Sequence, residues 1–597
     1  MSGMTVSGAA ASPGASQPDT AKTTPDPVGR RSLLTPVNVI IASATLLALG
    51  LRLYQLTRPG YLLSVTEYDD GPYFGSAIRL VNGSIPYRDF LLVQPPGITL
   101  LMTPAALVGK VVGTDWALAI GRLLTVCAGA ACVSVVGLLV RHRGVFAVVV
   151  ACGLTAIYPD SIQAAHTVLV EPWLALFCLL GAIAVFDGDR LTASGRRLAW
   201  GGVAFGFAGA VEVWAIFPMA VIAVLSLRAP RRLAVYIAGA AAGFLVPILP
   251  FAIIAPRGLY QGLVTAQVGG RFHATRVPNW SRVKEMVGLT DFSVPHSTVW
   301  LVALVIVAFV AVTLLLATAV TRRPPTSLEW FAVASTALVA AAFMWPNQFH
   351  YHFVAFLAPF LALAIALPSA RLMQDAQPRQ DAAAVPDAAV VPGAAVVPGA
   401  AVVPGAAVVP GAAAVPGAAA VPGAAAAQDA RRPGARRWTA TPALQWGATG
   451  LAGLAIVCLA IVQGHSETSL EPHVSYSTVT AVRRLIPPGA CVVTDQVSMT
   501  IAADRFVSDV PGCPLLVDSI GTDYALSHGR NPVTGAAKFP AVVAVWRNVL
   551  RHAQYLWLSG REALRVPWTP GLMAYFHQHF TQILGHGANS GLFRRRG

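Results

Sequence analysis

Residues 36–71 read PVNVIIASATLLALGLRLYQLTRPGYLLSVTEYDDG, an apolar run followed closely by three carboxylates. About 20 apolar residues suffice to cross the hydrocarbon core of a bilayer as one helix, and residues 36–56 meet that length. Carboxylates beside such a helix are costly, so they need a compensating role. The stretch therefore predicts a membrane protein with a polar site at the end of its first span.

The composition of the whole chain agrees with a membrane protein. Of its 597 residues, 55% are hydrophobic and 12% are charged, and the mean hydropathy is +0.62. Soluble domains carry about 25% charged residues, so the composition excludes a soluble enzyme and a coiled coil. Seven cysteines are too few for a disulfide-rich secreted module. Basic cytoplasmic loops of a membrane protein would account for the net charge of +15. We therefore expect no nucleic-acid partner.

Ten further apolar runs follow the first, so we expect a polytopic all-α membrane protein with about 11 transmembrane helices. These runs are residues 116–140, 145–162, 169–187, 198–211, 213–228, 233–255, 298–320, 329–346, 351–370 and 441–463. The two runs within 198–228 are short for spans. Residues 91–113 are also apolar, but QPPG and Lys110 interrupt them. We expect a helix there that lies partly along the outer interface.

Arginines mark one side of the predicted spans. If the N-terminus is cytoplasmic, every predicted inner loop is basic, as the positive-inside bias requires. The short inner loops hold Arg141, Arg143, Arg190, Arg196, Arg197, Arg228, Arg231, Arg232, Arg322 and Arg323. An odd number of spans then places the C-terminal residues outside the plasma membrane. Membrane lipids surround the spans.

The composition divides the chain into five parts. Residues 1–35, rich in Gly, Ser, Thr and Pro, predict a disordered cytoplasmic tail. Residues 36–370 form the transmembrane module, with a first outer loop at 57–115. Residues 371–440 form a cytoplasmic linker in which VPGAAV repeats predict a flexible tether or, alternatively, a partner-binding segment. Residues 441–463 are the last span, and residues 464–597 form a small extracytoplasmic α/β domain.

The C-terminal domain mixes strand and helix patterns. ACVVTD at 490–495 predicts a strand, and AVVAVWRNVL at 541–550 suits either a helix or a strand. Cys491 and Cys513 lie in this part, where a disulfide would persist. The sequence leaves a bridge and two free thiols equally open.

Acidic residues at the predicted outer ends of the spans are the first site candidates. Asp69 and Asp70 precede Gly71-Pro72, which is typical of the start of a helix at about 73–82. Alternatively, one carboxylate is a general base, and its neighbour holds a metal or an acceptor hydroxyl. The two roles are compatible, because a cap would fix the position of the base.

Three further groups have both a structural and a functional interpretation. Glu171 before Pro172 either starts a helix or faces a site, and His166 either forms a hydrogen bond or binds a metal. Glu212 either pairs with an arginine or faces the same cavity. Asp70, His166 and Glu171 are therefore possible ligands of a divalent metal, and no cofactor is certain.

Basic residues of two other segments could bind an anion. Arg271 and Arg276 in GGRFHATRVPNW suit a phosphate, because a guanidinium donates two parallel hydrogen bonds; the alternative is a lipid headgroup. His350 and His352 point apart on a helix and together on extended backbone, and either bond structurally or contact a phosphate or sugar. The sequence has no Walker phosphate loop, which argues against an ATP-driven pump.

Five motifs together resemble the GT-C superfamily of membrane glycosyltransferases. They are EYDDG (67–71), PYRDF…QPPG (86–97), LVEPW (169–173), HYHFVAFLAPFLALA (350–364) and ACVVTD…AADRF (490–506). The branch that they resemble most is that of protein O-mannosyltransferases and lipid A aminoarabinose transferases. The resemblance covers residues 36–370 and 440–597, and the Ala- and Pro-rich composition looks actinobacterial.

The resemblance implies an inverting transferase at the outer face. It would move a monosaccharide, with mannose or arabinose as the guess, from a polyprenyl-phosphate donor to a cell-envelope glycan, lipid or protein acceptor. Asp69 and Asp70 match the acidic pair of the family, with Asp69 as the base, and Glu171 matches the acid of the second loop. Arg271 and Arg276 match arginines that hold the lipid phosphate. Glu212 departs from the pattern, because relatives often have lysine near this point, and the departure puts the donor pocket in doubt.

Two other functions compete with this interpretation. A transporter or flippase of lipid-linked sugars would share the basic loops, but internal repeats are typical of that class, and we find none. A non-catalytic scaffold for envelope assembly would keep the transferase fold without its activity, and Glu212 leaves this alternative open.

Overall fold

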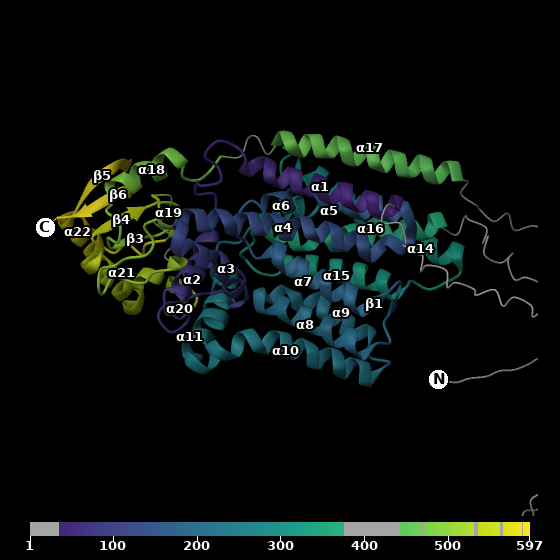
Figure 1. Cartoon of the computed structure of the whole chain (residues 1–597), viewed down its shortest axis with the longest axis horizontal. Coiled ribbons are helices and arrows are strands. Elements are labelled where there is room, and N and C mark those ends of the chain that lie inside the picture. The colour runs from purple at the N-terminus through teal and green to yellow at the C-terminus, as the bar shows by residue number, and fades with distance from the viewer. Residues whose placement is uncertain are drawn as a thin grey trace, which may run out of the picture.

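The computed structural model describes residues 35–374, 442–466, 471–530, 535–560, 565–587 and 589–596. Most of the predicted N-terminal tail and of the repeat linker lie outside these residues. The described chain forms an elongated bundle of helices with a small mixed domain at one end, where the C-terminus lies (Figure 1). Helix α17, Pro442–Ser466, runs along one side of the bundle beside α1, Pro36–Leu56.

Every predicted span coincides with a helix. Besides α1 and α17, they are α4 (Thr114–Val140), α5 (Gly144–Ile157), α7 (Glu171–Val185), α8 (Gly195–Val211), α9 (Ile216–Leu225), α10 (Pro230–Ile254), α14 (His296–Thr321), α15 (Ser327–Met344) and α16 (Val354–Gln374). Among the described residues, seven helical segments are long and apolar enough to cross a membrane, and one is the continuous stretch Thr114–Ile157. The chain is a multi-pass membrane protein. The orientation of the chain in the membrane stays a prediction. The count of eleven spans also stays a prediction, because α7, α8 and α9 are shorter than these seven segments.

Shorter elements connect the spans. Near the C-terminal domain lie α2 (Asp70–Val81), α3 (Gly97–Val112) and α11 (Pro256–Tyr260) (Figure 1), and the π-helix η3 (Gln261–Ala266) and α12 (Gln267–His273) contact α20 (Ser519–Leu526) of that domain. Four more are α6 (Pro159–Gln163), η2 (Val213–Ala215), α13 (Asn279–Met286) and η4 (Tyr351–Phe353). At the opposite end they are η1 (Arg141–Arg143) and the strands β1 (Phe186–Asp187) and β2 (Arg190–Leu191). The expected helix in 91–113 is α3, and the helix expected at about 73–82 begins earlier, at Asp70.

Helices α8 and α10 pack with their backbones in contact. A Cβ atom built on Gly206 of α8 would lie 2.0 Å from the carbonyl oxygen of Ala240, and one on Gly243 of α10 would lie 2.1 Å from that of Val203. Small residues allow such close approach between membrane helices. The contact fixes the end of α8, where Glu212 follows.

The C-terminal domain is built on a four-stranded sheet in the order β3-β4-β6-β5. Strand β3 (Val492–Thr494) is parallel to β4 (Tyr555–Leu558), while β6 (Ser590–Arg595) is antiparallel to both β4 and β5 (Phe580–Gly587). The helical elements are α18 (Tyr476–Leu485), α19 (Val497–Ala502), α20 (Ser519–Leu526), η7 (Ala536–Lys538), α21 (Pro540–His552) and α22 (Pro570–His579). The strand predicted in ACVVTD is confirmed as β3, and residues 541–550 are helical.

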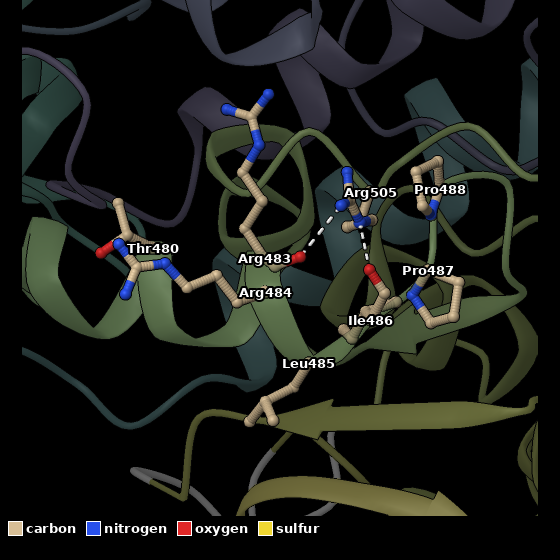
Figure 2. Close-up of a pocket in the computed structure, with 8 residues that line it drawn as sticks. All are labelled: Thr480, Arg483, Arg484, Leu485, Ile486, Pro487, Pro488 and Arg505. Carbon is tan, nitrogen blue, oxygen red and sulfur yellow. Dashed lines mark hydrogen bonds between the residues drawn. The ribbon is translucent and has the colours of Figure 1, made fainter.

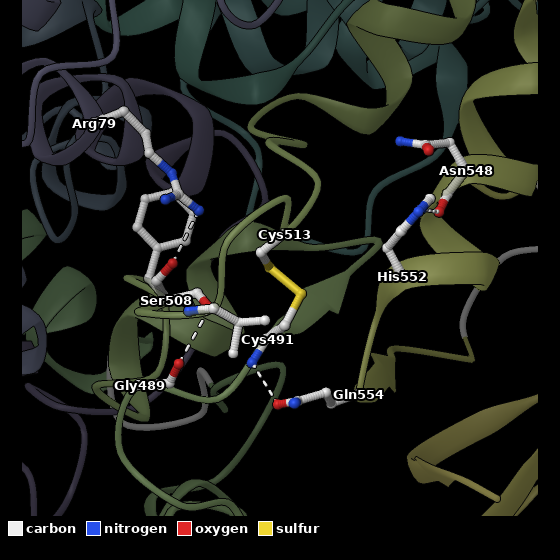
Figure 3. The surroundings of a disulfide bond; sticks show 10 residues. Arg79, Gly489, Cys491, Ser508, Cys513, Asn548, His552 and Gln554 are labelled. Atoms are coloured by element: carbon white, nitrogen blue, oxygen red, sulfur yellow. Dashed lines mark hydrogen bonds between the residues drawn. A yellow bond between two sulfur atoms is a disulfide. The ribbon is translucent and has the colours of Figure 1, made fainter. Parts of the chain in front are cut away.

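A disulfide joins Cys491, directly before β3, to Cys513 in the segment before α20 (Figure 3). Of the two alternatives that the sequence left open, the structure has the bridge. Beside it, the backbone N–H of Cys491 donates a hydrogen bond to Gln554 Oε1 at 3.1 Å. The disulfide therefore ties the edge of the sheet to the segment that leads to α20.

The C-terminal domain is attached to the first loop, residues 57–115, by a shared core. Phe74 of α2 packs in the same apolar cluster as Val497 and Ile501 of α19. The guanidinium of Arg79 lies over the Phe506 ring and donates to the Phe506 carbonyl oxygen at 2.9 Å. These contacts hold the domain against α2.

Candidate active site

A polar cavity of about 290 Å³ lies between the helical bundle and the C-terminal domain. The first loop supplies Glu67, Tyr68 and Asp69, and α20 with the residue before it supplies Asp518, Ile520, Gly521 and Tyr524. The remaining lining residues are Pro72, Tyr73, Val93, Gln94, Glu171, Glu212, Ala266, Gln267, Gly270, Gln348, His350, Phe353 and Arg565. The cavity thus unites segments from almost the whole length of the chain.

Asp69, Glu171 and His352 form a hydrogen-bonded chain at this cavity. Glu171 Oε1 lies 2.8 Å from His352 Nδ1, and His352 Nε2 lies 3.4 Å from Asp69 Oδ2. The side chains of His352 and Glu171 are 2% and 1% exposed, whereas that of Asp69 is 27% exposed. Asp69 is therefore the member of the chain that is most accessible from the cavity.

The environment of Asp69 favours its ionised form. Burial raises the pKa of Asp69, but the hydrogen bond and the charge of His352 outweigh burial, and the pKa is lowered. Although Asp69 occupies the N-cap position of α2, its side chain makes no capping hydrogen bond. The carboxylate is thus available to accept a proton from a bound group.

Asp70 lies in a different environment from Asp69. Its carboxylate forms a fully buried ion pair with Arg122 of α4 at 3.1 Å and accepts a hydrogen bond from Thr167 at 2.6 Å. Asp70 does not line the cavity. Its position therefore suits a role in joining α2 to α4 rather than contact with a substrate.

Two carboxylates that the sequence analysis did not single out also line the cavity. Burial and the nearby Asp69 raise the pKa of Glu67, which accepts a hydrogen bond from Tyr351 at 3.2 Å. Burial raises the pKa of Asp518 to about 6, and Asp518 accepts a hydrogen bond from the Tyr68 hydroxyl at 3.2 Å. Both carboxyl groups are therefore protonated more readily than exposed carboxyl groups.

Glu212 and His350 both line the cavity. Glu212 faces the common cavity, and its Oε1 also accepts a hydrogen bond from the Val213 backbone N–H at 3.0 Å. The rings of His350 and His352 stack with centroids 5.3 Å apart. They lie together because His350 has extended backbone before the short helix η4.

Two buried acceptors of the cavity wall have no hydrogen-bond partner among the described residues. They are Glu171 Oε2 and Gln94 Oε1. Buried polar atoms in proteins are almost always paired. A ligand with several hydroxyl groups could supply the missing donors.

The two arginines expected to hold a phosphate are not part of the described cavity wall. Arg276 is exposed and donates to Asn347 Oδ1 at 3.4 Å and Asn279 Oδ1 at 3.3 Å. Arg271 belongs to α12, but its side chain lies outside the described part of the structure. Among the described lining residues, Arg565 of the C-terminal domain is the only arginine or lysine.

The possible metal ligands do not converge. His166 bonds to the Gln163 carbonyl oxygen, Asp70 pairs with Arg122, and Glu171 bonds to His352. Within the described residues, no group of three or more His, Cys, Asp or Glu side chains is arranged to hold a metal ion. The residues that the sequence offered for a metal therefore do not fit one common site.

A second, more open depression of about 520 Å³ lies on the surface of the C-terminal domain (Figure 2). It is basic, but two of its arginines bind other protein groups. Arg483 pairs with Asp115 at 2.6 Å and with Asp504 at 3.2 Å. Arg505 donates to the Ile486 carbonyl oxygen at 2.8 Å. These contacts hold α18 against the start of α4, so we do not include this depression in the candidate site.

Comparison with known proteins shows similarity in structure only. No family model matches the sequence, and no curated protein matches it. The solved structure of ArnT from Cupriavidus metallidurans bound to undecaprenyl phosphate has a TM-score of 0.53 at 11% identity, over 93% of this chain and 97% of that chain. Its apo form has a TM-score of 0.51 at 12% identity over the same shares. The chain therefore shares its overall fold with this ArnT structure.

An archaeal oligosaccharyltransferase, AglB from Archaeoglobus fulgidus, aligns more loosely, with a TM-score of 0.46 at 13% identity over 87% of this chain and 69% of that one. The GT-C fold confirms the fold class expected from the five motifs. The actinobacterial origin suggested by composition stays a prediction. At such low identity, the residues of the cavity must be judged on their own geometry.

Proposed function

We propose that this protein is an inverting glycosyltransferase that uses a sugar linked to polyprenyl phosphate. The observation that carries the proposal is the chain Glu171–His352–Asp69, which ends in an accessible carboxylate at a buried polar cavity. The GT-C fold supports the class of donor, since one solved structure of this fold holds undecaprenyl phosphate.

Asp69 would act as the general base. Its carboxylate takes the proton from an acceptor hydroxyl, whose oxygen forms a bond with the anomeric carbon of the donor sugar. The bond between that carbon and the phosphate oxygen breaks with its electron pair, and polyprenyl phosphate leaves with inversion. The lowered pKa of Asp69 keeps its carboxylate ionised, which is the form that can accept the proton.

His352 and Glu171 would position Asp69. The imidazole lies between the two carboxylates, so its orientation is fixed from both sides. Glu171 Oε2 and Gln94 Oε1, both buried and without partners among the described residues, would accept hydrogen bonds from sugar hydroxyls.

An apolar groove of about 950 Å³ supports a lipid-linked donor. It is lined by residues of α3, α7, α8 and α10, among them Leu100, Phe177 and Phe207. Phe207 on α8 lies five positions before Glu212, which lines the polar cavity. Five helical residues span about 7.5 Å, so a prenyl chain in the groove could present its phosphate near the cavity.

The finer assignments come from composition and from the resemblance. Mannose or arabinose as the sugar, and a cell-envelope glycan, lipid or protein as the acceptor, are suggested by the Ala- and Pro-rich composition alone. Arg271 and Arg276 remain proposed phosphate ligands from the resemblance. A cytoplasmic N-terminus and an extracytoplasmic C-terminal domain would place the reaction at the outer face.

Replacement of the proposed base tests this function. Asp69→Asn should reduce transfer from radiolabelled polyprenyl-phosphate sugars in isolated membranes by at least about 100-fold, the usual scale of a general base. Asp89→Asn is the matched control, because Asp89 lies in the same loop but pairs with Arg88 outside the cavity.

Full transfer by Asp69→Asn would show that Asp69 is not the base. Movement of labelled lipid across vesicles, without formation of a glycosidic bond, would favour the transporter. Wild-type protein that binds donor without transfer or transport would favour the scaffold.

A further inference from the structure

The C-terminal domain is bonded to the two residues that directly precede the proposed base. Gln496 Nε2 and Ser498 Oγ both donate to the Glu67 carbonyl oxygen at 3.0 Å. The hydroxyl of Tyr68 reaches the start of helix α20 in the same domain. The backbone that leads into Asp69 is therefore held by residues more than 400 positions away in the sequence.

The hydroxyl of Tyr68 occupies the N-terminal end of α20. It accepts a hydrogen bond from the Ile520 backbone N–H at 3.1 Å. It also lies 3.0 Å from Ser519 Oγ and donates to Asp518 Oδ1 at 3.2 Å. The N–H groups of the first helical turn have no partner within their own helix, so the phenol satisfies one of them. The guanidinium of Arg565 lies 4.5 Å from the centroid of the Tyr68 ring, so the C-terminal domain contacts both the ring and the hydroxyl.

The position of Asp69 depends on the backbone that precedes it. Asp69 occupies the N-cap position of α2, but its side chain makes no capping hydrogen bond. Its carboxylate lies 3.4 Å from His352 Nε2, a contact that leaves room for movement. A shift of Tyr68 would displace the base relative to an acceptor hydroxyl, and a displacement of about 1 Å can slow a reaction about 100-fold.

We propose that Tyr68 is a positioning residue for Asp69, so that the docking of α20 against the first loop sets where the base lies in the cavity. This inference rests on the proposed function and deepens it. Burial raises the pKa of Asp69 and His352 lowers it, and both influences remain when the hydroxyl of Tyr68 is removed. Loss of the hydroxyl should therefore change the placement of the base and leave its ionisation as it is.

Steady-state transfer by the purified full-length protein tests this inference. The probes are radiolabelled polyprenyl-phosphate sugars, with mannose and arabinose among them. Tyr68→Phe keeps the ring beside Arg565 and removes only the hydroxyl. It should lower kcat by about 10- to 100-fold. KM for the donor and the acid limb of the pH–rate profile should not change.

Tyr575→Phe is the matched control variant. Tyr575 lies in the same domain outside the cavity, and its hydroxyl accepts a hydrogen bond from Arg595 at 3.2 Å. Both variants lose a hydroxyl that bonds within the protein, so a general loss of stability would affect both. Tyr575→Phe should keep the kcat of the wild type.

The outcomes separate this inference from the proposed function. Wild-type kcat in Tyr68→Phe would overturn the inference and leave the transferase proposal standing. A raised KM at wild-type kcat would overturn it because Tyr68 would then contact the donor, and a displaced acid limb would overturn it because Tyr68 would then act on ionisation. Absence of transfer by the wild type from every polyprenyl-phosphate sugar would contradict the proposed function and, with it, the inference.

A second variant guards against misfolding. If Tyr68→Phe does not yield a monodisperse protein, Ser519→Ala decides. Ser519 Oγ contacts the Tyr68 hydroxyl, but Ser519 does not line the cavity, so its replacement removes no contact with a substrate. A lower kcat at unchanged KM and with an unchanged acid limb supports the inference. Wild-type kcat overturns it.

Discussion

His352 lies between two carboxylates and so influences the ionisation of the proposed base. Burial raises the pKa of Asp69, and the hydrogen bond and charge of His352 lower it below its usual range. His352→Gln removes that charge, so the pKa of Asp69 should rise. The base is active above its pKa, and the acid limb of the pH–rate profile should therefore move to higher pH. Transfer at neutral pH should also fall, by up to about 100-fold, because Asp69 loses the group that positions it.

The pH dependence of transfer by the purified variant checks this prediction. His296→Gln is the control, because His296 is exposed and stacks on Trp280 outside the cavity. An unchanged acid limb in His352→Gln, together with a lower rate, would mean that His352 acts on something other than Asp69.

Single residues show where prediction from sequence ends. The structure brings Asp69, Glu171, Glu212 and His350 to one cavity, as their clustering at the ends of spans suggested. Asp70, next in the chain, instead pairs with Arg122, because α2 begins at this residue and successive helical side chains point about 100° apart. Arg565 also lines this cavity but carries no local signal in the sequence, since its position depends on how a distant domain docks.

Among the elements, the contact between α8 and α10 gives a direct test of packing. A Cβ on Gly206 would lie 2.0 Å from the Ala240 carbonyl oxygen, whereas one on Gly209 would meet only ordinary contact with Phe244 at 3.4 Å. Gly206→Ala should therefore lower stability by about 1–3 kcal/mol, as overpacking does. Gly209→Ala is the control and should be neutral or stabilising, because alanine favours a helix over glycine.

Thermal unfolding of both variants in the same detergent measures the difference. Equal melting temperatures for Gly206→Ala and Gly209→Ala would mean that α8 and α10 separate easily. Transfer should fall with Gly206→Ala as well, because α8 carries both the wall of the apolar groove and the residue before Glu212.

Most elements could be predicted because most spans, though not α7, α8 and α9, are long and apolar enough to identify alone. The eleven predicted runs all coincide with helices. The limits are less predictable: α9 covers only Ile216–Leu225 of the run 213–228, since the chain after Glu212 begins with the separate short helix η2. The π-helix at Gln261–Ala266 has no pattern that distinguishes it from an ordinary helix.

For the whole molecule, composition and motifs predicted the fold class. They did not predict which segments come together to complete the site. Hydropathy separates a membrane module from a mixed domain without saying how the two meet. The meeting surface depends on contacts such as Gln496 with Glu67, between residues more than 400 positions apart. Such pairs leave no periodic signal in one sequence, so the part of the cavity wall that the C-terminal domain supplies could not be predicted.

The disulfide gives a test of that meeting surface. Cys513 precedes the segment that carries Asp518 and α20 to the cavity, and the bond to Cys491 anchors this segment to the sheet. Loss of a bond that closes a loop of this size costs about 3 kcal/mol. Cys491→Ser with Cys513→Ser should lower both the melting temperature and transfer, because α20 forms part of the cavity wall.

Reductant supplies the matching control for this prediction. Dithiothreitol should lower the melting temperature of the wild type and leave the double variant unchanged, since the variant has no bond to lose. Cys127→Ser and Cys458→Ser, at exposed free cysteines, should keep the response of the wild type. If the double variant kept full transfer despite a lower melting temperature, contacts such as Tyr68 with Asp518 would hold α20 against the cavity without the disulfide.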